Sequence, residues 1–250
     1  MERPTGGFED IVIVAEGFDA PTLLQRILHA VNHTAPPLPG APPQRSVIHI
    51  RGLAHRDCVL MGLDHPLHLQ VEGPLGDYAL AFNGQVNARI TGAVGDGVGE
   101  GMASGAIRVR GDAGVGAGVA MRGGTLAIYG NTGANCGAAM CGGELFVRGD
   151  VGPSAAAGAL GGTIVIGGDA AEGLGDSMQR ATIFIRGKAA ALGRGVRESP
   201  LRERERMRLG LLLINAGIRG DVKDFRRIVS GATLRREAAR PRTEIDPSWR

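Results

Sequence analysis

Residues 110–124 read RGDAGVGAGVAMRGG, and this stretch decides the fold of the chain. Six of its fifteen residues are glycine, and few of its side chains could do chemistry. It could be a phosphate-binding loop, a flexible linker or one copy of a structural repeat. Across the chain, 42 of 250 residues are glycine, whereas ordinary proteins contain about 7%. The explanation must therefore hold for the whole chain.

The stretch belongs to a repeat of nineteen residues. A glycine follows an apolar triplet at this interval seven times, at Gly73, Gly92, Gly111, Gly130, Gly149, Gly168 and Gly187. An earlier copy, VIHIRG, ends at Gly52, 21 residues before the first of them. Regular internal repeats of about this length are the signature of solenoid proteins. A linker or a single phosphate loop does not explain them.

Each copy opens with alternating apolar residues, the pattern of a half-buried strand. The first inward column is Ile48, Leu69, Ala88, Ile107, Leu126, Leu145, Ile164 and Ile183. The second is Ile50, Val71, Ile90, Val109, Ile128, Val147, Ile166 and Ile185. A strand–helix–strand unit needs about 30 residues, so nineteen are too few for one. The sequence predicts an all-β fold, a right-handed parallel β-helix of about eight rungs over residues 46–198.

Two further columns follow from this register. The residues between the inward positions should face solvent or a partner: His49, Gln70, Arg89, Arg108, Ala127, Phe146, Val165 and Phe184. Met102, Met121, Met140 and Met178 should form a third inward column, since flexible thioethers fill irregular space. Glycine suits the sharp turns because it allows a positive φ and close backbone approach.

The open ends of a solenoid must be covered. Residues 1–45 are predicted to cap the N-terminal end with a short helix and a proline-rich connection at 34–44. Asp19 is the candidate N-cap, with Pro21 near the first helical position. Leu24, Ile27, Leu28 and Val31 follow at helical spacing.

Residues 199–250 are predicted to form C-terminal helices and a basic tail. Ser199 and Pro200 would begin a first helix with Met207, Leu211 and Ile214 on one face, and Gly217 would end it. DVKDFRRIVSG at 221–231 would form a second short helix. The remaining residues lack an apolar period, and Trp249 suggests that this tail docks on another chain.

The charge distribution and composition of the chain argue against several classes of protein. Residues 199–250 carry 13 basic and 7 acidic residues, whereas the rest carries 15 and 18, so the net charge of +3 comes from the tail. No nucleic-acid motif accompanies these charges, so an acidic protein partner is favoured. No apolar run is long enough for a membrane span, and the N-terminus does not resemble a signal peptide. Three irregularly spaced cysteines argue against a disulfide framework and favour a cytoplasmic setting.

The candidate chemical sites have simpler structural explanations. GVGEGMASG at 97–105 partly matches a dinucleotide loop, but a strand rather than a helix follows it. A second candidate is a metal site in the first rungs, formed by His49, His55, His65 and His68 with Cys58 and Asp64 nearby. We expect His49 and His68 to point outward, so these residues should not converge as ligands.

Two further candidate sites are a column of acidic residues and the three cysteines. Asp112, Asp150 and Asp169 follow their strands and should cap turns locally, with a calcium ladder as the alternative. Cys136 and Cys141 should be small buried thiols between glycines, and Cys58 has no definable partner base. We therefore expect no catalytic, cofactor-binding or metal-binding residue in this chain.

The repeat GDAGVGAGVAMRGGTLAIYGNTGANCGAAMCGG resembles the Gly-x-Gly-x-Gly β-helix domain at the C-terminus of the glutamate synthase large subunit. GGDAAEGLGDSMQRATIFIRGKAAALG and DFRRIVSG resemble more closely the small standalone subunit of glutamate-synthase-like complexes, including the N-methylglutamate synthase of methylamine metabolism. The resemblance covers roughly residues 46–230.

The resemblance implies a non-catalytic scaffold. In such oxidoreductase complexes this subunit accompanies a glutamine amidotransferase subunit and an FMN-binding synthase subunit, and ammonia passes between their sites. FMN, and an iron–sulfur cluster if present, would lie in the partners, and no cofactor would be bound by this chain alone. The expected assembly is a hetero-oligomer without nucleic acid or membrane.

Two alternatives stay open. One is the C subunit of formylmethanofuran dehydrogenase or of the related formyltransferase/hydrolase complex, a scaffold with the same fold. The other is an independent carbohydrate-binding or carbohydrate-cleaving β-helix, which usually shows exposed aromatic or carboxylate columns. Nine aromatic residues in total, with Tyr129 and Phe146 among the few at outer positions, make it the weaker one.

Overall fold

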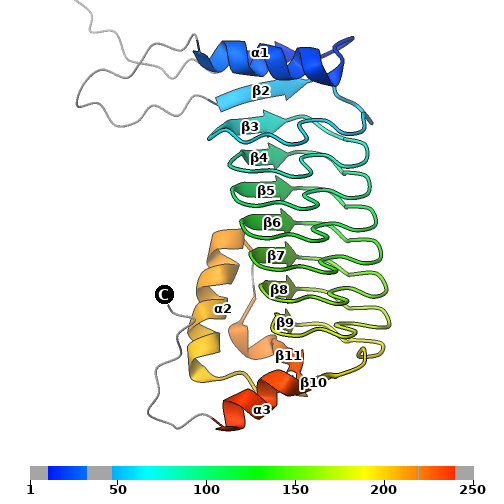
Figure 1. Cartoon of the computed structure of the whole chain (residues 1–250), viewed down its shortest axis with the longest axis vertical. Helices are drawn as coiled ribbons and strands as arrows, with labels where there is room; N and C mark the ends of the chain where they lie inside the picture. Colours follow the sequence, from blue (N-terminus) through cyan, green and yellow to red (C-terminus); the bar gives the residue numbers. More distant parts are fainter. Residues whose placement is uncertain (1–10, 33–46, 219, 240–250) are drawn as a thin grey trace, which may run out of the picture.

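A computed structural model of the chain describes residues 11–32, 47–218 and 220–239. Eight parallel strands stack in chain order along the long axis, as Figure 1 shows. They are β2 (Val47–Arg51), β3 (His68–Val71), β4 (Asn87–Ile90), β5 (Ala106–Val109), β6 (Thr125–Ile128), β7 (Glu144–Val147), β8 (Thr163–Ile166) and β9 (Thr182–Ile185). The predicted parallel β-helix is confirmed.

The inward columns pair as the repeat requires. Ile107 of β5 pairs with Leu126 of β6, and Val109 pairs with Ile128. Every residue of both columns is buried and belongs to one continuous core. The four predicted methionines join that core. In the rung before them, the equivalent position holds Asn83, whose buried amide donates to the carbonyl oxygens of Val86 and Ser104.

Every second residue of the Gly-x-Gly-x-Gly motif, three in all, has the left-handed backbone conformation. In one coil these are Gly97, Gly99 and Gly101, with φ between 63° and 69°. Successive amide groups then point to opposite neighbours: Gly97 N donates to Val115 O of the following rung, and Gly99 N to Ala79 O of the preceding one. The turn thereby bonds to both neighbouring rungs, as a strand does.

The N-terminal end is covered by a strand and a helix. β1 (Ile11–Val14) pairs in parallel with β2, an extension of the sheet that the sequence analysis did not predict. α1 (Ala20–Asn32) lies across this end in Figure 1, and Asp19 Oδ1 accepts from Thr22 N at 2.8 Å, confirming the predicted cap. Leu23 and Ile27 are buried, whereas the predicted inward residue Leu24 is exposed.

The C-terminal end is closed differently from the prediction. DVKDFRRIVSG forms a 3-10 turn, η1 (Val222–Asp224), and a strand, β11 (Arg226–Ser230), instead of a helix. β11 pairs antiparallel with β9 and with β10 (Val196–Ser199). A further helix, α3 (Gly231–Ala239), occupies part of the segment expected to lack structure. A reversed strand covers the open edge of the last rung.

α2 (Glu203–Ala216) begins at a different residue from the one predicted, and it buries a different face. Ser199 ends β10, and the helix is capped by Arg202, whose backbone N donates to Glu205 Oε2 at 3.0 Å. Gly217 ends it as predicted, with a φ of 67°. The buried face consists of Leu209, Leu212, Leu213 and Ala216, and not of Met207, Leu211 and Ile214.

The outward column divides into two halves. Ala127, Phe146, Val165 and Phe184 are buried beneath α2 in a second core, and Figure 1 shows α2 alongside β6–β9. The earlier residues, His49, Gln70, Arg89 and Arg108, are half-buried or exposed. Apolar outward residues therefore mark the rungs that the helix covers, and polar ones mark the open rungs.

Several predictions concern residues outside those described: the proline-rich connection at 34–44 and the tail with Trp249. Within the described ranges, none of the helices is long and apolar enough to cross a membrane.

Candidate functional site

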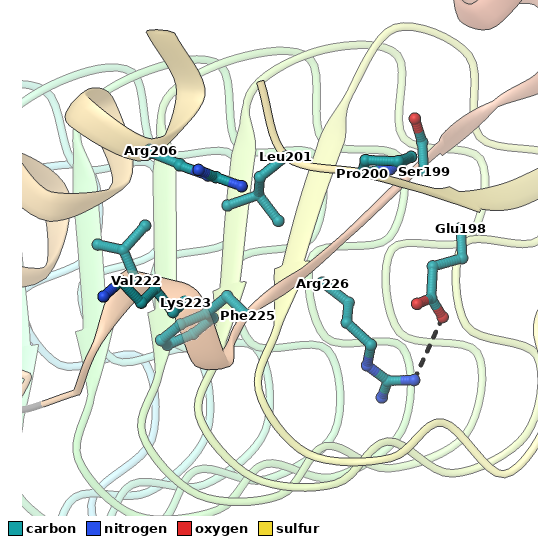
Figure 2. A pocket seen from close by; sticks show the side chains of 9 residues that line it. All are labelled: Glu198, Ser199, Pro200, Leu201, Arg206, Val222, Lys223, Phe225 and Arg226. Carbon is teal, nitrogen blue, oxygen red and sulfur yellow. Dashed lines mark hydrogen bonds and ion pairs between the residues drawn. The ribbon is translucent and has the colours of Figure 1, made fainter. Parts of the chain in front are cut away.

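A groove with a volume of about 500 Å³ lies between α2, η1 and β10. Its floor is apolar and includes Leu201, Val222 and Phe225. Figure 2 shows these side chains with the charged residues that surround them. The groove exists because Pro200 and Leu201 lead the chain from β10 to the start of α2, while η1 returns it to the sheet.

The charged lining of the groove is mostly basic. Arg206, Lys223 and Arg226 contribute three positive charges, and Glu198 contributes one negative charge. Arg226 Nη1 lies 3.2 Å from Glu198 Oε2, and Arg226 also donates to Gly187 O. Arg206 Nη1 lies 3.5 Å from Glu203 Oε2, so Lys223 is the lining cation with no described carboxylate in ion-pair distance. The lining also includes Ser199, whose hydroxyl oxygen accepts from Arg227 Nη1 at 3.3 Å.

A buried ion-pair cluster holds the elements around the groove together. The Arg227 guanidinium is 2% exposed, and its Nη2 lies 2.5 Å from Glu237 Oε1 of α3. Its Nε lies 2.7 Å from Glu205 Oε1 of α2, without the alignment of a hydrogen bond. Arg202 also pairs with Glu237, so two arginines and two glutamates balance. The cluster ties β11, α2 and α3 into one cap.

The predicted histidine cluster does not converge. His49 and His68 are half-buried on adjacent strands, where His49 is in register with Gln70 and His68 with Val47. His55, His65 and Cys58 are exposed, and Asp64 Oδ1 accepts from Gln85 Nε2 at 2.9 Å. Among the residues that the structure describes, no three His, Cys, Asp or Glu side chains are placed to hold a metal ion.

The acidic column bonds between rungs and not within its own turn. Asn131 N donates to Asp112 Oδ1 at 2.7 Å, and Asp169 N to Asp150 Oδ1 at 2.7 Å, each donor nineteen residues further along. Asn131 continues the ladder by accepting from Asp150 N. The prediction that these carboxylates cap their own turns is therefore wrong, because each accepts from a backbone N–H of the next rung. The side chains replace strand bonds where the coil turns away from the sheet.

The three thiols are free and differ in burial. Cys136 is buried as predicted, and desolvation raises the pKa of its thiol to about 11. Cys141, predicted to be buried, is exposed, as is Cys58. A protonated buried thiol is a packing group, because the thiolate is the nucleophile.

The two predicted outer aromatic residues are covered. Phe146 lies beneath α2, and the Tyr129 hydroxyl donates to Ala216 O at the end of that helix. Among the residues that the structure describes, the exposed aromatic residues are Tyr78 and Phe82, at left-handed positions of one turn, and neither was a candidate from the sequence. Two rings on one turn do not form the column typical of carbohydrate-binding β-helices.

Comparison of the sequence with protein-family models gave no match, and comparison with curated proteins gave none either.

Proposed function

We propose that the chain is the non-catalytic scaffold subunit of a cytoplasmic, glutamate-synthase-like enzyme of the N-methylglutamate synthase type. In this role it packs between a glutamine amidotransferase subunit and an FMN-binding synthase subunit. The observation that carries the proposal is the Gly-x-Gly-x-Gly repeat, through which the resemblance arises and whose alternating left-handed residues build each coil. Such a rod offers a long outer surface for partners.

Two features of the surface support a binding role. The groove has an apolar floor and a mostly basic lining. The outer face of β2–β5 is left open by α2, with Arg89 and Arg108 along it. Polar open faces and apolar grooves with charged rims are what a protein partner recognises.

The test is purification of the tagged chain from its native host. The proposal predicts a stoichiometric complex that shows flavin absorption and hydrolyses glutamine. A chain that isolates without an FMN-containing partner would refute it. A molybdopterin or amidohydrolase partner would instead support the alternative, the C subunit of formylmethanofuran dehydrogenase or of the formyltransferase/hydrolase complex.

A further inference from the structure

α2 carries a second apolar face on the side opposite its buried one. Met207, Leu211 and Ile214 are 57%, 64% and 76% exposed. They are spaced four and three residues apart, so they form one stripe along the helix. At about 100° per residue, this stripe lies roughly opposite Leu209, Leu212 and Leu213, which pack on the sheet. Folding of the described chain leaves it uncovered.

Positive charge flanks the stripe on both sides. Arg204 and Arg208 are exposed along one flank. Arg206 lies on the other, 3.5 Å from Glu203, and Lys223 lines the groove beside it. No described carboxylate lies within ion-pair distance of Arg204, Arg208 or Lys223. These cations are therefore available to acidic groups of a binding partner.

The stripe and the groove adjoin each other. Arg206, one residue before Met207, also lines the groove. A Cβ on Gly210 would lie 3.6 Å from Val222 Cγ2 of η1, so η1 packs against the helix on this flank. The stripe therefore runs beside the groove, with Arg206 and Gly210 of α2 between them, and basic side chains border both.

We propose that this surface docks an amphipathic helix of a separate protein chain, with aspartate and glutamate residues bordering its apolar stripe. A stripe at i, i+4 and i+7 fits the ridges of a second helix. Acidic borders would pair with the unbalanced cations and direct the encounter. This deepens the scaffold role and rests on it, since the partner would be another subunit of the complex.

Charge argues against two other occupants. A second copy would meet this surface through the same patch on both chains, and positive flanks on both sides would then face each other. Residues 240–250 of this chain carry three arginines and two acidic residues, so they bring no excess of negative charge. A separate acidic chain is the occupant that balances the surface.

The experiment places a photo-crosslinking amino acid at Leu211 in the full chain, expressed in the native host. We expect a crosslink to a different protein, within a peptide in which Asp and Glu flank apolar residues at helical spacing. A crosslink to a second copy, to residues 240–250, or to no protein would overturn the proposal. So would a partner peptide without acidic residues.

A pair of substitutions gives the second measurement. Leu211→Glu should lower the recovered partner at least tenfold, because it places a carboxylate in an apolar contact. Leu160→Glu, at a residue 41% exposed outside the groove and the stripe, should leave it unchanged. Thermal unfolding should match wild type for both. Equal recovery with Leu211→Glu would refute the docking surface while the scaffold role stands.

The two proposals can fail separately. If the wild-type complex contains no FMN subunit, the scaffold role fails. The docking surface is then judged by the crosslink alone, and it stands only if the crosslinked peptide is acidic and amphipathic.

Discussion

Replacing Phe146 tests whether α2 is held by the apolar half of the outward column. The Phe146 side chain is 0% exposed and belongs to the cluster that contains Leu209, Leu212 and Leu213 of α2. A buried Phe→Ala change costs about 3–5 kcal/mol. Because α2 can settle partly into the space, we expect the lower value, about 3 kcal/mol. The loss should be concentrated at the C-terminal cap, since rungs of a solenoid contact only their neighbours.

Amide hydrogen exchange of α2 measures this loss. About 3 kcal/mol corresponds to roughly a hundredfold faster exchange of α2 amides that open with the helix. Arg108→Ala, at the equivalent position two rungs earlier, is the matched control and should change stability by about 0.5 kcal/mol or less. If both variants leave α2 exchange unchanged, the helix is not held by this column and the division of the sheet face is wrong.

Three further predictions concern other parts of the molecule. Gly111→Ala should lower the urea midpoint, because its Cβ would lie 2.6 Å from the backbone of the preceding rung, whereas Gly210→Ala should be neutral or stabilising. Arg227→Met should cost about 3 kcal/mol, because it leaves Glu205 without its cation and Glu237 with Arg202 alone; unchanged protease resistance of α3 would contradict this. At pH 8 a thiol reagent should label two cysteines and reach Cys136, whose pKa is raised to about 11, only after unfolding.

The period of nineteen residues was enough to predict the solenoid. In stacked coils of equal length, each strand residue pairs with the residue one period further along the chain. Each inward residue has an equivalent nineteen positions away, so one correct assignment places all the others. The outward column held more information than its mixed composition suggested. Its change from arginine to apolar residues after Arg108 indicates a cover, and with four buried members the cover is α2.

The structures of the two caps were harder to predict, because the local sequence pattern fits more than one arrangement of each segment. α2 has leucines at 209, 211, 212 and 213, so helical periodicity alone allows either face to be buried. β1 and β11 are only four and five residues long, and their identity as strands depends on the sheet edges that they cover.

The same limit applies to the candidate site. The groove is formed by residues far apart in the sequence, such as Glu198 and Lys223, with no motif that joins them. The acidic column could be read from the sequence, but the partner of each carboxylate follows from the offset between rungs, which only the structure supplies.

Native mass spectrometry of the intact complex from the native host tests the scaffold proposal most directly. The proposal predicts one assembly that contains this chain, a glutamine amidotransferase subunit and an FMN-carrying subunit, with FMN lost only from the last. A spectrum that shows this chain alone, or only copies of itself, would contradict it.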